Sequence, residues 1–122
     1  MKTGTVLNFE QTFTTEDIIQ FISLAGYESN ELMSDGCIYL MLQGLLTATL
    51  PTKVGSEYGF IAWETSFTFT RPVFTGDTIH CKVHITETIT KNDHLCITIE
   101  FLCTNQHDCE VLKGQFLGSI SQ

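Results

Sequence analysis

Apolar and polar residues alternate with a period of two through most of the second half of the chain, and this pattern predicts long β-strands. The apolar sides of three expected strands are Ile61, Trp63, Thr65, Phe67 and Phe69; Ile79, Cys81, Val83, Ile85 and Ile89; and Leu95, Ile97, Ile99, Phe101 and Cys103. Leu112, Phe116 and Ile120 anchor a fourth. The connections at 72–77, 91–93 and 105–108 are short and rich in turn formers, so we expect antiparallel neighbours.

The first part of the chain predicts a short strand over residues 5–13, followed by a helix over residues 17–24. Thr14-Thr15-Glu16-Asp17 has the pattern of a helix-capping sequence, and Gly26 is a typical helix stop. Residues 27–35 are polar and irregular, which predicts a loop.

Residues 36–50 carry apolar side chains on nearly every side of a helix, and Pro51 ends the pattern. A helix that is apolar all round is a buried helix. At 15 residues and about 1.5 Å per residue it would span roughly 22 Å, the width of one small domain. We therefore predict a single α+β domain over residues 1–122, in which a curved antiparallel sheet of about five strands wraps a long central helix.

Six Lys and Arg residues against fourteen Asp and Glu residues give a net charge of -8, which disfavours nucleic acid as a partner. The sequence lacks a long apolar run and an apolar signal sequence, so we expect a cytoplasmic protein without a membrane span. The five cysteines are odd in number and form no C-x-x-C pair, which favours reduced, buried thiols.

The stretch Phe67-Thr68-Phe69-Thr70-Arg71-Pro72-Val73-Phe74-Thr75-Gly76-Asp77-Thr78-Ile79 resembles the strand-turn-strand segment of hotdog proteins, and of MaoC-like hydratases and dehydratases above all. Residues 13–21 resemble the opening strand-to-helix step of that family, and residues 43–48 its central helix. The resemblance covers nearly the whole chain. It implies the hotdog fold and an acyl thioester ligand, carried by coenzyme A or an acyl carrier protein.

The catalytic motif of those hydratases, G-D-x-N-P-x-H, is not matched. In the corresponding run Gly26-Tyr27-Glu28-Ser29-Asn30-Glu31-Leu32, Tyr27 replaces the Asp and Leu32 replaces the His. Neither catalytic residue of the family is therefore carried over to this chain.

A hotdog hydratase or thioesterase needs a carboxylate or a His near the N-terminus of its central helix, where backbone N–H groups polarise the thioester carbonyl. Glu28, Glu31 and Asp35 are the available carboxylates, and Glu31 and Asp35 are the candidates for a general base that activates water. The alternatives are a helix cap at Asp35 and solvated loop positions at Glu28 and Glu31.

Tyr39, Gln43 and Thr47 recur every four residues and form one polar stripe on the apolar helix. We interpret the stripe either as the wall of a ligand pocket, with Gly44 allowing close approach, or as a hydrogen-bonded contact with neighbouring strands. A coenzyme A site would also need positive charge near its phosphates, for which Arg71 is the first candidate.

His80 and His84 lie about 13 Å apart along one expected strand, so they cannot share a metal ion. We expect surface histidines, no metal and no cofactor. Two hypotheses remain. The protein is an enoyl-thioester hydratase or dehydratase, or a thioesterase, that uses a loop carboxylate; or it is a non-catalytic binder of acyl thioesters or lipid-like ligands. In both, we expect a homodimer or higher homo-oligomer formed through exposed strand edges.

Overall fold

The computed structural model describes residues 2–25 and 44–121. The labelled elements are β1 (Val6–Thr12), α1 (Thr15–Ala25), α4 (Lys53–Tyr58), β2 (Ile61–Phe69), β3 (Thr78–Lys91), β4 (His94–Thr104) and β5 (Glu110–Ser121). Residues 44–48 are also helical. The predicted loop at 27–35 and the predicted helix stop at Gly26 lie outside the described residues.

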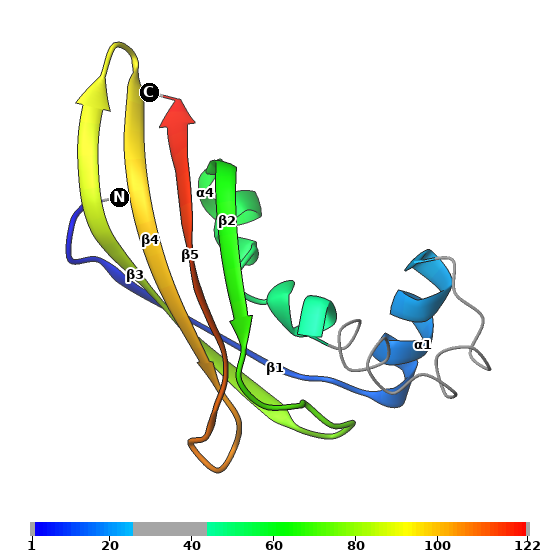
Figure 1. Cartoon of the computed structure of the whole chain (residues 1–122). Helices are drawn as coiled ribbons and strands as arrows, with labels where there is room; N and C mark the ends of the chain where they lie inside the picture. The colour runs from blue at the N-terminus through cyan, green and yellow to red at the C-terminus, as the bar shows by residue number, and fades with distance from the viewer. Residues whose placement is uncertain (1, 26–43, 122) are drawn as a thin grey trace.

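The five strands form one sheet in the order β1-β3-β4-β5-β2, and every neighbouring pair is antiparallel. Figure 1 shows that β3, β4 and β5 are long and curved, and that the helical segments lie on one side of the sheet. The predicted curved antiparallel sheet is therefore confirmed.

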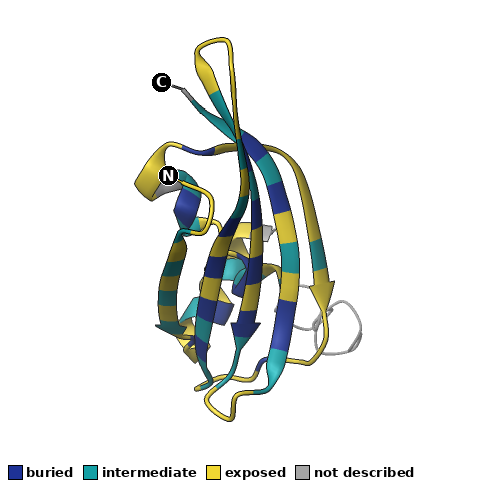
Figure 2. Ribbon diagram, turned by 90° about the vertical axis from the view of Figure 1, so that its left-hand side faces the viewer, coloured by how far each residue is buried: buried dark blue, intermediate teal, exposed yellow. Residues whose placement is uncertain are grey.

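The core lies on the face of the sheet that carries alternate residues of β3, β4 and β5, which we call the inner face. Its fully buried members include Ile79, Cys81, Val83, Ile85, Ile99, Cys103 and Leu112. Buried and exposed bands alternate along these strands in Figure 2. The period of two in the sequence therefore marks the inner face correctly over most of the sheet.

The register shifts at three places in the sheet, and two of these shifts correct the predicted stripes. The register of β3 against β4 shifts between Ile85 and Glu87, so Ile89 pairs with Cys96 on the outer face and is 53% exposed. The register of β2 against β5 shifts between Ala62 and Glu64, so Ile61 points outward and Ala62 inward. A bulge adds one residue to one strand and exchanges the faces of all residues beyond it.

The connection at 72–77 is short, yet it does not join neighbouring strands. β2 pairs with β5 at one edge of the sheet, whereas β3 lies between β1 and β4. The prediction that this connection makes an antiparallel pair is therefore wrong, while the β3–β4 and β4–β5 hairpins are as predicted. The reason is geometric: at Thr70–Asp77 the chain crosses the end of the sheet, where Phe13 exchanges backbone hydrogen bonds with Gly76 and Asp77.

The capping sequence at the start of α1 forms a reciprocal pair of hydrogen bonds. The Thr14 backbone N–H donates to Asp17 Oδ2 at 2.9 Å, and the Asp17 N–H donates to Thr14 Oγ1 at 3.2 Å. This satisfies two donors at the helix end. The helix begins at Thr15, two residues before the predicted start.

A long helix over residues 36–50 is not seen in the described part of the chain, and residues 36–43 lie outside it. Residues 44–48 are helical, a turn occupies 49–52, and the short helix α4 follows. Thr49 and Leu50 each donate to the carbonyl three residues earlier, so the helix tightens and ends before Pro51. Ala48 and Leu50 are buried, whereas Leu45 is 37% exposed. The segment 44–50 is therefore not buried on every side, although the apolar pattern predicted that it would be.

Cys81 and Cys103 are fully buried and face each other across β3 and β4. Cys96 and Cys109 are half-buried, and all four of these described cysteines carry free thiols. Cys37 lies outside the described residues. In the ranges that the structure describes, no helix is both long enough and apolar enough to span a bilayer.

Candidate functional site

Three of the residues selected from the sequence line one cavity on the inner side of β2. Gly44, Thr47 and Arg71 share this cavity, which we call the Arg71 cavity and which has a volume of about 200 Å³. Its other lining residues are Phe69, Thr70, Pro72, Val73 and Val111. Glu31, Asp35, Tyr39 and Gln43 lie outside the described residues, as does Glu28.

Arg71 is held at the end of β2 by the neighbouring strand. Its Nη1 donates to the Glu110 carbonyl oxygen at 2.9 Å, and Thr70 Oγ1 donates to the same oxygen at 3.0 Å. The Thr70 N–H also donates to the Val111 carbonyl at 3.0 Å, which extends the β2–β5 pairing by one residue. The bond to Glu110 uses one of the five N–H groups of the guanidinium, whose planar fork suits carboxylates and phosphates.

Thr47 is the one polar residue in the buried core of the described part of the chain, with 2% of its surface exposed. It lies in the helical segment 44–48 and lines the Arg71 cavity. A threonine hydroxyl can both donate and accept a hydrogen bond. The lining of the cavity therefore combines a threonine with an arginine.

The ring of Phe69 leaves no space for a side chain at position 44, so this position requires a glycine. A Cβ added at position 44 would lie 2.7 Å from Phe69 Cδ1 and 2.8 Å from Cε1, closer than real Cβ contacts. The close approach that we predicted for Gly44 is therefore occupied by an aromatic side chain of β2.

A second cavity, which we call the apolar cavity, lies farther along β2 beside α4. It has a volume of about 390 Å³, and its lining residues are Thr52, Val54, Gly55, Phe60, Ala62, Thr65, Phe67 and Phe116. Phe67, Phe101 and Phe116 form an aromatic cluster behind it, with ring centroids 4.8 to 6.0 Å apart. The sequence pattern did not predict this cavity, because α4 and the inward position of Ala62 were not expected.

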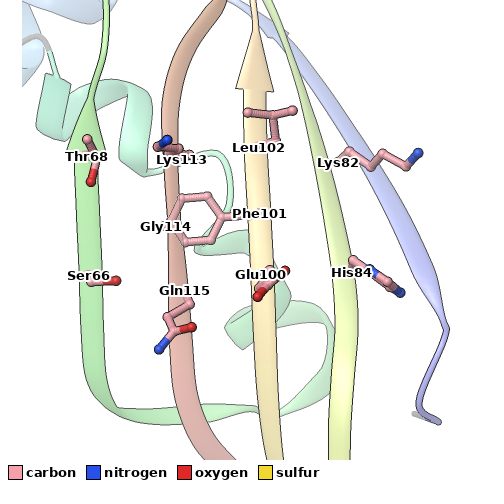
Figure 3. Close-up of a pocket in the computed structure, with 10 residues that line it drawn as sticks. All are labelled: Ser66, Thr68, Lys82, His84, Glu100, Phe101, Leu102, Lys113, Gly114 and Gln115. Atoms are coloured by element: carbon pink, nitrogen blue, oxygen red, sulfur yellow. The ribbon is translucent and has the colours of Figure 1, made fainter.

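A groove of about 560 Å³ crosses the outer face of the sheet (Figure 3). Lys82 and Lys113 flank Leu102 across three strands, and His84 and Gln115 flank Glu100 in the next row. The groove is thus a polar surface with charges of both signs. Small-molecule sites are mostly apolar with few polar groups, so the two inner cavities are the better candidates for an acyl ligand.

Among the residues that the structure describes, those that line the Arg71 cavity supply hydrogen-bond donors and no carboxylate or imidazole. Such a lining can bind and polarise a carbonyl oxygen. Metal chemistry has no support in the described residues, where no three His, Cys, Asp or Glu side chains group together. His84, His94 and His107 are exposed and His80 is half-buried.

Sequence reasoning missed most of the lining of the Arg71 cavity. Phe69 and Thr70 could have been found, since they directly precede Arg71 at the end of a predicted strand. Val111 could not, because only the pairing of β2 with β5 brings it there.

A sequence family described as the FAS1-like dehydratase domain region matches residues 21–113, most of this 122-residue chain. No curated protein sequence matches the chain.

Solved structures share the fold over almost the full length. The (R)-hydratase from A. caviae involved in PHA biosynthesis has a TM-score of 0.79 and 20% identity, covering 98% of this chain and 97% of that one. The MaoC-like dehydratase from Rhodospirillum rubrum has a TM-score of 0.68 and 13% identity, covering 100% and 94%. The C-terminally truncated HadBC (3R-hydroxyacyl-ACP dehydratase) complex from Mycobacterium tuberculosis has a TM-score of 0.68 and 16% identity, covering 96% of each chain.

Proposed function

The chain belongs to the family of FAS1-like dehydratase domain regions, and from this premise we propose that it binds an acyl thioester in the cytoplasm and acts on it as a hydratase or dehydratase. The thioester would be carried by coenzyme A or by an acyl carrier protein. One observation carries the proposal: Gly44 and Thr47, predicted as part of a pocket wall on one helix, line a single cavity together with Arg71, which was predicted separately as a contact for coenzyme A.

In this proposal Thr47 and Arg71 orient the polar end of the ligand. Thr47 would contribute a hydroxyl that can hydrogen-bond a carbonyl oxygen, and Arg71 would supply the positive charge that a phosphate prefers. Arg71 is one of six cationic side chains in a chain of net charge -8, so an anionic ligand group has few other partners.

The reaction would add water across the double bond of a 2-enoyl thioester, or remove it from a 3-hydroxyacyl thioester. Hydroxide is delivered to C3 and a proton to C2, so a general base must take a proton from water. Glu31 and Asp35 are our candidates for that base, on sequence grounds alone.

A second function, a non-catalytic acyl-thioester binder, is favoured by one specific observation. Tyr27 and Leu32 stand where related hydratases carry their Asp and His, and the described residues of the Arg71 cavity lining include no carboxylate or imidazole. Such a protein would bind the thioester in the cavity without catalysing a reaction on it.

One assay separates these functions. Purified protein is incubated with saturated and 2-enoyl thioesters, while enone absorbance and free thiol are followed. We expect loss of enone absorbance that Glu31→Gln or Asp35→Asn reduces at least about a hundredfold, and that the control Glu87→Gln on β3 leaves unchanged. Thiol release without enone loss would assign a thioesterase. Saturable binding without turnover would assign the binder.

We also propose a homodimer formed through β2. This strand ends the sheet, and Ile61 and Trp63 on it are 72% and 62% exposed. Edge strands with exposed apolar residues are usually covered. The structurally similar HadBC dehydratase is itself a complex, which supports an assembly here.

A further inference from the structure

Two stacked phenylalanine rings on β2 belong one to each of the two inner cavities. Phe69 lines the Arg71 cavity and Phe67 lines the apolar cavity. Both side chains leave β2 on its inner face, and their ring centroids are 6.2 Å apart at an interplanar angle of 25°. The linings of the Arg71 cavity and the apolar cavity therefore meet at this ring pair, which we call the partition.

We propose that Phe69 determines the length of acyl chain that the protein accepts, because its ring closes the path from the Arg71 cavity into the apolar cavity. The inference rests on the proposed function and names its substrate class as short-chain acyl thioesters. A ligand whose polar end lies at Thr47 and Arg71 meets the Phe69 ring before it reaches Phe67.

The cavity volumes support a short chain. Pockets that bury a complete small ligand usually measure about 300–1,000 Å³. The Arg71 cavity, at about 200 Å³, is below this range, and the apolar cavity, at about 390 Å³, is within it. A long acyl chain would need both cavities at once, and the partition denies it the second.

Phe69, rather than Phe67, is the residue on which selection depends. The Phe67 ring contacts Phe101 at 5.8 Å and Phe116 at 6.0 Å between centroids, so it is fixed in the core. Phe69 is 43% exposed and has Phe67 as its one aromatic neighbour among the described residues. The ring also lies against Gly44, where a Cβ would come within 2.7 Å of Phe69 Cδ1.

The test measures binding of non-hydrolysable thioether analogues of butyryl-, octanoyl- and dodecanoyl-pantetheine by calorimetry. For the wild type we expect the butyryl analogue to bind at least about tenfold more tightly than the dodecanoyl analogue. Phe69→Ala should improve dodecanoyl binding about tenfold and change butyryl binding less than about threefold.

Phe74→Ala is the matched control, since Phe74 is 62% exposed and lines neither cavity. It should leave the chain-length profile of the wild type unchanged. Phe69→Leu keeps an apolar side chain at this position and should shift the profile in the same direction, so a folding defect in Phe69→Ala does not obscure the result.

Two outcomes would overturn the inference and are distinguishable. If the wild type binds the butyryl analogue and both Phe69 variants keep its chain-length profile, the partition does not select chain length, and the proposed function stands. If the wild type binds none of the three analogues, the acyl-thioester function falls and the inference falls with it.

Discussion

The carbonyl oxygen of Ser66 on β2 occupies the space in which a side chain of Gly114 on β5 would begin. A Cβ at position 114 would also lie 2.8 Å from Phe101 Cζ. Since the obstructing atom belongs to the backbone, it cannot move without shifting β2. We expect Gly114→Ala to lower the free energy of unfolding by about 1–3 kcal/mol, as measured by urea denaturation.

The neighbouring substitution Gln115→Ala is the control for that measurement, because Gln115 is exposed on the outer face. It should change stability by less than about 0.5 kcal/mol. Equal stability of Gly114→Ala and the wild type would show that β2 is not held against β5 as described.

Gly44→Val should abolish ligand binding in the Arg71 cavity with little cost to the helical segment. Valine has a higher helix propensity than glycine, so local helix formation is not impaired. Its side chain would displace the Phe69 ring and fill space that a ligand needs. We expect affinity for the butyryl thioether to fall at least about tenfold by calorimetry. The adjacent Leu45→Val, at a 37% exposed residue outside the cavity, should bind as the wild type does.

Arg71→Ala should weaken binding of an acyl-coenzyme A analogue and make that binding less sensitive to salt. A guanidinium that contacts an anionic group contributes a charge-assisted hydrogen bond that ionic strength screens. Lys91→Ala at the β3–β4 turn removes the same charge from an exposed position outside both cavities. Titration with the analogue at low and high salt separates the two variants. Equal losses of affinity in both would show that Arg71 acts only through the net charge of the protein.

Cys103 should make the fold less stable at alkaline pH. A hydrogen bond with Cys81, burial and the charge of Cys81 together raise the pKa of the Cys103 thiol. The unfolded thiol ionises near pH 8.5 while the folded one stays protonated, so the folded state binds more protons. Above that pH, stability falls by up to about 1.4 kcal/mol per pH unit.

Urea unfolding of Cys103→Ala across this pH range should show a shallower loss than the wild type. Iodoacetamide labelling with peptide mapping gives an independent check. Cys96 and Cys109 are half-buried and should react in the native protein, whereas Cys81 and Cys103 should react only in denaturant. Rapid native labelling of Cys103 would contradict its burial.

Ile61→Lys should convert the expected dimer into a monomer. Ile61 is 72% exposed on the edge strand, so the substitution costs a monomer little stability and places a charge where a second strand would pair. Light scattering after gel filtration measures the mass directly. Ile89→Lys, on the outer face of β3, is the control and should remain dimeric. A monomeric wild type would contradict the assembly itself.

The sequence predicted those features that depend on one strand or helix at a time. The stripes from Ile79 to Ile85 and from Ile97 to Cys103 identified the inner face, because a side-chain period of two is a property of each strand alone. The capping sequence at Thr14 and Asp17 was also readable, since both partners are local.

Features that depend on pairing between distant strands could not be predicted. The outward turn of Ile61 and Ile89 follows from bulges that exist only relative to β5 and β4. Val111 reaches the Arg71 cavity because β5 pairs with β2. The contact between the Phe69 ring and Gly44 joins two segments that are distant in the sequence. The pattern of apolar and polar residues could not predict it.

Because of the bulge in β3, a residue can be removed at Thr86 without changing the face or the pairing partner of the other β3 residues. Thr86 has no pairing partner in the β3–β4 ladder, and its hydroxyl donates to the Thr98 carbonyl at 3.2 Å. Deleting it would restore a regular ladder, with Glu87 still opposite Thr98 and Thr88 still opposite Ile97. Deleting Val83 instead would turn one segment of the strand over and bring Lys82 or His84 into the core. Insertions and deletions in β3 should therefore be tolerated at this residue and rejected a few positions before it.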